Sequence, residues 1–103
     1  MTVPALTNAW AFLRNVAGVA VAAKGATLTV TGVGDYTLNL NQAADSLETA
    51  ITVTPESAGR MVRIVHTSDT AKQILTYDDA GVAADSDFTA LVERILGSAT
   101  GGY

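Results

Sequence analysis

The chain has no cysteine, which excludes disulfide bonds and thiolate metal sites but leaves its redox compartment open. Histidine occurs once and proline twice in 103 residues, so no site can use a pair of histidines from one chain. Aromatic residues make up only 6% of the sequence, whereas alanine, which adds little buried area, supplies 18 residues. We therefore expect one domain with a modest core that association between subunits would help to stabilise.

Positive charge is scarce as well. Six basic residues are scattered from Arg14 to Arg94 against ten acidic ones, giving a net charge of −4 and a pI of about 4.6. Proteins that bind nucleic acids need clustered Lys and Arg to replace the counterions of phosphates. The composition therefore predicts no nucleic-acid partner and no attachment to an anionic membrane surface.

Long apolar runs are also missing. Residues 9–23 are mostly apolar, but Arg14, Asn15 and Gly18 interrupt them, and the stretch is too short to span a bilayer. Residues 1–4 lack the positive region with which a secretory signal begins. We expect a complete, soluble product that is made in the cytoplasm and has no membrane partner.

What the sequence does contain is the alternation of β-strands. Between residues 26 and 41, apolar and polar side chains alternate on both sides of a glycine-rich link at residues 32–35. Period-two alternation is typical of half-buried strands, and two such runs around a short turn predict a β-hairpin. The apolar positions are Leu28, Val30, Tyr36, Leu38 and Leu40.

Other short runs extend this pattern along the chain. We expect strands at 9–16 (with a helix as the alternative), 19–22, 47–53, 61–65, 74–77 and 88–96. The continuous apolar run at 61–65 predicts a strand buried on both faces, and 67–72 reads as a polar link. The predicted fold is all-β, a small antiparallel β-sandwich or barrel of about seven to eight strands. Residues 1–8 would form an N-terminal arm, 9–96 the β domain and 97–103 a flexible C-terminal tail.

An acidic set after the seventh predicted strand is the best candidate for a metal site. It consists of Asp78, Asp79, Asp85 and Asp87. Four carboxylates within ten residues could supply oxygen ligands for Ca²⁺, but their spacing matches no EF-hand or repeat-type calcium loop. Aspartate and glycine are also ordinary turn residues, so a solvated turn is the favoured interpretation and calcium binding stays open.

Catalytic patterns are absent. His66, the only histidine, is followed by Ser68 and Asp69, but neighbours in sequence do not make a catalytic triad. Gly32 and Gly34 form half of a dinucleotide fingerprint that no helix follows, so they read as a turn. The alternating threonines at 27, 29 and 31 lack the fixed period of an ice-binding ladder and fit the wet face of a strand. We expect no enzyme activity and assign no catalytic, cofactor-binding or metal-binding residue.

The few aromatic residues allow two interpretations. Trp10, Tyr36, Tyr77 and Phe88 could line a platform for a sugar ring, but with so few large side chains we expect them to fill the core.

Two segments carry a resemblance to a known family. Gly34, Tyr36, Leu38 and Leu40 form the first, and Asp78, Gly81, Asp85 and Phe88 the second. Together they resemble a small β domain found at the distal ends of phage tail fibres and in bacterial collagen-like surface proteins. The resemblance covers roughly residues 9–95 and implies a trimeric protein of the virion surface. It transfers no functional residue, and here the domain has neither a stalk nor a collagen repeat.

These observations lead to two hypotheses. In the first, the chain is a structural phage virion protein, a capsid decoration (cement) or head-spike protein located on the virion. It would form a homotrimer and bind the major capsid protein or other virion subunits, with arms 1–8 and 97–103 reaching neighbours. In the alternative, it is the receptor- or glycan-binding tip domain of a tail fibre or tailspike, whose partner is a host surface glycan.

Overall fold

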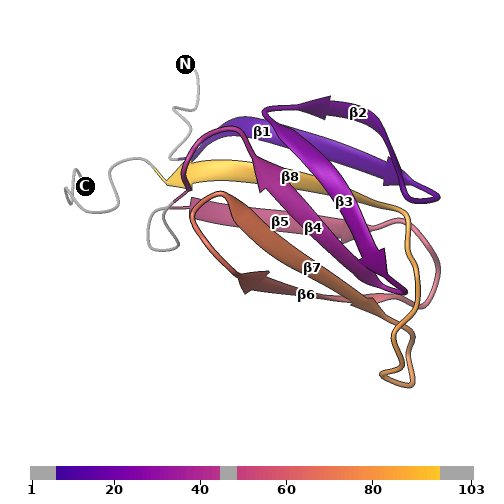
Figure 1. Cartoon of the computed structure of the whole chain (residues 1–103). Coiled ribbons are helices and arrows are strands. Elements are labelled where there is room, and N and C mark those ends of the chain that lie inside the picture. Colours follow the sequence, from indigo (N-terminus) through magenta and orange to yellow (C-terminus); the bar gives the residue numbers. More distant parts are fainter. Residues whose placement is uncertain (1–6, 45–48, 96–103) are drawn as a thin grey trace, which may run out of the picture.

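The computed structural model describes residues 7–44 and 49–95. Within them the chain forms eight β-strands, which all pair antiparallel, and no helix (Figure 1). The strands are β1 (Thr7–Val16), β2 (Val19–Lys24), β3 (Ala26–Gly32), β4 (Asp35–Leu40), β5 (Thr49–Pro55), β6 (Met61–His66), β7 (Ala71–Tyr77) and β8 (Phe88–Ile95). This confirms the predicted all-β class.

The strands form two four-stranded sheets that pack face to face as a sandwich. One sheet has the order β2-β1-β8-β5 and the other the order β3-β4-β7-β6 (Figure 1). Their inward faces supply the core, whose fully buried large side chains include Leu13, Leu38, Ile74, Phe88 and Val92. The predicted sandwich is therefore confirmed, with eight strands.

The predicted hairpin at 26–41 is confirmed, and the structure gives its register. Leu28 pairs with Leu38 and Val30 with Tyr36, so the apolar side chains of β3 and β4 share the inward face. The threonines of β3 lie on the opposite face and are exposed, as expected for a wet face. Gly34, in the turn between the strands, has a φ of +61°.

β1 is a strand, as favoured, and its alternate residues from Ala11 to Asn15 face the core. Ala11, Leu13 and Asn15 are buried, while Phe12 is 38% exposed on the outer face. β1 also includes the backbone of Thr7 and Asn8 from the expected arm. The rest of that arm, Leu47 of the fifth predicted strand and the expected tail at 97–103 lie outside the described residues.

The prediction that residues 61–65 form a strand buried on both faces is wrong. β6 lies at the edge of its sheet and pairs only with β7. Only Val62 and Val65 are half-buried, the other four residues of β6 are exposed, and Met61 is 49% exposed. A continuous apolar run fits an edge strand when the opposing sheet covers only part of one face.

β7 begins at Ala71 and not at Ile74, which corrects the interpretation of 67–72 as a polar link. The earlier start places Lys72 on the inward face, where it is 1% exposed. No helix in the described part of the chain is long and apolar enough to cross a membrane.

Candidate functional site

The acidic segment lies in the loop that joins β7 to β8 at one end of the sandwich (Figure 1). Asp78 begins it by closing a tight turn: one carboxylate oxygen accepts the N–H groups of Ala80 and Val82, each at 2.9 Å. The N–H of Asp78 in turn donates to the carbonyl of Val82. Aspartate side chains commonly stabilise turns in this way. Asp78 is thus engaged by its own loop, as the turn interpretation expects.

The loop then crosses the end of the second sheet next to Gly34. The N–H of Ala84 donates to the carbonyl of Thr76, and the Thr76 hydroxyl donates to the carbonyl of Ala84. Gly34 lies so close that a Cβ at this position would collide with the Thr76 carbonyl and come within 2.9 Å of the Ala84 nitrogen. Only glycine combines this closeness with a positive φ, so Gly34 lets the loop lie against the sheet.

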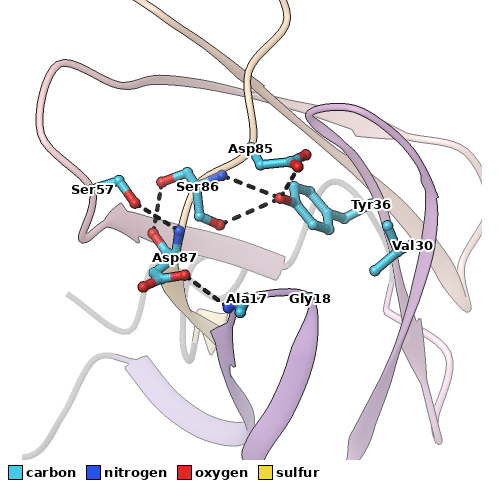
Figure 2. Close-up of a pocket in the computed structure, with 8 residues that line it drawn as sticks. All are labelled: Ala17, Gly18, Val30, Tyr36, Ser57, Asp85, Ser86 and Asp87. Atoms are coloured by element: carbon cyan, nitrogen blue, oxygen red, sulfur yellow. Dashed lines mark hydrogen bonds between the residues drawn. The ribbon is translucent and has the colours of Figure 1, made fainter.

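Asp85 and Tyr36 hold the next part of the loop. One carboxylate oxygen of Asp85 accepts the N–H of Gly34 at 2.7 Å and lies 3.4 Å from the Tyr36 hydroxyl. That hydroxyl accepts the N–H of Ser86 at 3.2 Å (Figure 2). The Tyr36 ring is buried and meets the Phe88 ring edge to face, with centroids 5.0 Å apart. Tyr36 therefore joins the core to the loop.

Burial also changes the chemistry of Tyr36. Removal from water raises the pKa of its phenol above the ordinary value of 10.0, because the phenolate form would lose its hydration. The nearby Asp85 carboxylate raises the pKa further, whereas the hydrogen bond to the Ser86 backbone opposes the rise. Tyr36 is therefore a neutral structural group at physiological pH.

Asp87 joins three segments of the chain. One of its carboxylate oxygens accepts the N–H of Ala17, in the β1–β2 turn, at 2.9 Å. Its own N–H donates to the Ser57 hydroxyl at 3.0 Å, and its carbonyl accepts the N–H of Glu56. Asp87 is therefore a structural anchor that the acidic spacing alone did not identify.

These groups surround a cavity of ≈ 340 Å³ at the loop end of the sandwich (Figure 2). Its lining residues are Ala17, Gly18, Val30, Tyr36, Ser57, Asp85, Ser86 and Asp87. Among the residues the structure describes, no three His, Cys, Asp or Glu side chains gather closely enough to hold a metal ion. The four aspartates of the predicted set are thus spread along the loop, and only Asp85 and Asp87 line the cavity. Its hydroxyls and carboxylates offer hydrogen bonds to a small polar ligand.

The only histidine lies at the other end of the second sheet. His66 closes β6 and pairs with Lys72, whereas the acidic loop follows the far end of β7. His66 Nε2 is 3.6 Å from the Asp69 carboxylate, and the Ser68 hydroxyl accepts the N–H of Ala71. Ser68 therefore stabilises the β6–β7 turn, and the strand-end interpretation of His66 is confirmed.

Lys72 is the polar residue that the sequence pattern missed. Its ammonium group donates to the carbonyls of Ala44 at 2.8 Å and Ser68 at 2.7 Å, and it contacts His66 Nδ1. A buried ammonium needs such partners to replace water. Lys72 thereby ties two loops at this end of the sandwich, and no hydrophobic pattern could have placed it inside.

The expectation that the four aromatic side chains fill the core is confirmed for Tyr36 and Phe88, whereas Trp10 packs against the core cluster and Tyr77 is not part of it. Tyr36 and Phe88 are buried, and Trp10 is half-buried against the core cluster. Tyr77 is also half-buried.

β2 lies at the edge of its sheet and is exposed along its whole length. All six of its residues are exposed, on both faces of the strand, and Val19 and Val21 are 60% and 58% exposed. Val30 of the adjacent β3 is 48% exposed. β2 pairs only with β1, and this pairing skips Val21, which forms a bulge. An apolar edge strand with so little cover is unusual in a protein that functions alone.

Comparison of the chain with protein-family models, with curated proteins and with solved structures finds no match.

Proposed function

We propose that this chain is a structural protein of a phage particle, a capsid decoration or head-spike protein that works by assembly. It acts as a homotrimer on the virion and binds the major capsid protein or other virion subunits. Bound copies stabilise the shell by mass action, because a partner that binds only the assembled, folded form shifts the equilibrium toward it.

The observation that carries the proposal is the exposure of β2. An edge strand of valine and alanine, exposed on both faces, fits a subunit that is covered in its assembly. The side chains that could have carried chemistry also support an assembly role. Asp78, Asp85 and Asp87 hold backbone N–H groups, and His66 lies at the opposite end of the sheet. These groups support the architecture, so the surface is left as the functional part.

The test is to purify phage particles from the source of the chain and to separate DNA-filled heads from tails on a density gradient. An immunoblot for the chain should give a signal in the head fraction. Recombinant protein added to heads stripped of the chain should also rebind and raise the temperature at which they release DNA. If the chain stays in the soluble fraction and does not rebind heads, the proposal is wrong.

One observation favours the alternative of a receptor- or glycan-binding tip. The cavity at the loop end brings the Ser57 hydroxyl together with the carboxylates of Asp85 and Asp87, which are common partners of sugar hydroxyls. Saturation-transfer NMR with host surface glycans tests this function directly. Glycan signals that disappear in Ser57→Ala, together with the chain in the tail fraction of the gradient, would favour the alternative over the capsid role.

A further inference from the structure

Charge is distributed unevenly along this chain. All ten acidic residues lie at or after Asp35, so the first 34 residues contain no carboxylate side chain. Between residues 15 and 34, which include all of β2 and β3, the only charged side chain is Lys24. The side of the sandwich formed by these two edge strands therefore has almost no charge, although the whole chain has a net charge of −4.

The four edge strands of the sandwich differ in how well their residues protect them from contact with another protein chain. β5 ends in Pro55 and is mostly half-buried, and β6 carries Arg63 in its middle and His66 at its end. β3 presents exposed threonines. β2 has only valine and alanine before Lys24, without proline or an inward charge. Charges and prolines are the usual protection of an edge, and β2 has the least of it.

We propose that the β2–β3 side of the sandwich is the surface through which copies of this chain bind one another. The proposal deepens the assembly function above, on which it rests, by identifying the partner at this surface as a second copy. The distribution of charge favours a second copy of the chain as the partner. Two acidic chains repel each other least where carboxylates are fewest, and neither β2 nor β3 carries one. The carboxylates nearest to this side, Asp85 and Asp87, lie at its cavity end and accept the backbone N–H groups of Gly34 and Ala17.

The side chains of this surface suit a close apolar contact. Val19 and Val21 flank Ala20, whose small side chain lets another chain approach the β2 backbone. Val30 lies next to Gly18, the residue that precedes β2. Because the bulge at Val21 interrupts the regular strand, packing of side chains is the main contact. Contacts around a three-fold axis would join β2 of one copy to β3 of the next, since both strands lie on the same side of each sandwich (Figure 1).

The absence of cysteine allows a direct test by cross-linking. Val19→Cys, Val21→Cys and Val30→Cys each place one thiol on the proposed surface, and Val82→Cys in the β7–β8 loop is the control. Val82 is 59% exposed, so it matches Val21 in both residue type and exposure. With a flexible bismaleimide, the three surface variants should give covalently joined chains and V82C should remain a single chain. Equal cross-linking of V82C, or none in the surface variants, would overturn the proposal.

A second pair of variants measures the interface without a cross-linker. Val21→Lys places one new positive charge per copy where the copies meet, so the solution mass should fall to that of one chain, 10.6 kDa. Val82→Lys should keep the mass of the unmodified protein. If V21K kept that mass, the β2–β3 side would not be the interface. Binding to phage heads is measured separately. If the chains bind heads but associate through another surface, only this inference is wrong. If they associate through the β2–β3 side but never bind heads, only the capsid role is wrong.

Discussion

The hydroxyl of Tyr36 accepts a hydrogen bond from the N–H of Ser86 at 3.2 Å, although the two residues are 50 positions apart in the sequence. Tyr36 belongs to the second sheet, and Ser86 precedes β8, which belongs to the first. Both residues are buried. This bond therefore joins the two layers of the sandwich at the end where the acidic loop lies.

Removing the Tyr36 hydroxyl should destabilise the fold without disturbing the core. Tyr36→Phe leaves the buried N–H of Ser86 without its acceptor, and such a loss costs about 1–3 kcal/mol of unfolding free energy. Urea denaturation at neutral pH measures the change. Tyr77→Phe, which keeps the Tyr36 bonds, serves as the control, and equal losses in the two variants would contradict the role given to Tyr36.

The same variant should change how stability depends on alkaline pH. Because the pKa of Tyr36 is raised in the folded protein, the folded state keeps the phenol proton at pH values where the unfolded chain has lost it. The Tyr36 contribution is therefore complete below its ordinary pKa of 10.0 and decreases as pH rises from there through the folded pKa. Unfolding free energies measured between about pH 9 and pH 11 should fall more steeply in the wild type than in Y36F. Parallel curves would mean that Tyr36 does not titrate differently in the two states.

Gly34 should tolerate no side chain. Gly34→Ala combines a left-handed backbone with a collision against the Thr76 carbonyl, so we expect a loss of about 2–4 kcal/mol. Gly59→Ala is the matched control, because Gly59 has a φ of +65° but nothing within 4 Å of a Cβ. It should lose only about 1 kcal/mol. Thermal unfolding measures both variants, and equal losses would show that the loop does not press against Gly34.

Ala17 offers a substitution that should stabilise the protein. It is the only non-glycine residue of the described chain with a positive φ, at 54°. Ala17→Gly relieves this strain, keeps the N–H that binds Asp87, and should raise the unfolding free energy by about 0.5–1 kcal/mol. Ala58→Gly, at a turn residue without a positive φ, should be neutral or slightly destabilising. A loss of stability in A17G would contradict the strain.

Lys72 should be essential to the opposite end of the sandwich. Lys72→Met removes the donor to the Ala44 and Ser68 carbonyls, and we expect a loss of about 2–4 kcal/mol. Hydrogen exchange at the Ala44 amide, which donates to the carbonyl of Asp69, should also become faster. Arg63→Met, at an exposed basic residue of β6, should change stability by less than about 0.5 kcal/mol. Unchanged exchange in K72M would show that Lys72 does not hold this end.

The sequence predicted the parts of the fold that depend on alternation. The hairpin of β3 and β4 is an example, because each inward side chain there is apolar and each outward one is polar. Alternation could not place Lys72, a charged residue whose burial depends on carbonyls distant in the sequence. The sequence pattern also misplaced β6. A continuous apolar run does not reveal whether a strand lies at the edge of its sheet or in the middle, with both faces covered.

The loop-end site was predicted only in its composition. The acidic residues were identified, and the turn at Asp78 follows from its spacing to Gly81. The anchoring of Asp85 to Gly34 and of Asp87 to Ala17 joins residues 51 and 70 positions apart, which no local pattern encodes. The exposure of β2 was likewise hidden, because valine and alanine are equally typical of a buried strand.

The central claim is that this chain functions through association, and its solution mass tests that claim most directly. Light scattering after size exclusion, at protein concentrations from about 1 to 100 µM, covers the affinities expected of a specific subunit interface. The account predicts a mass close to three times 10.6 kDa for the unmodified protein. A mass of one chain across the whole range would contradict it.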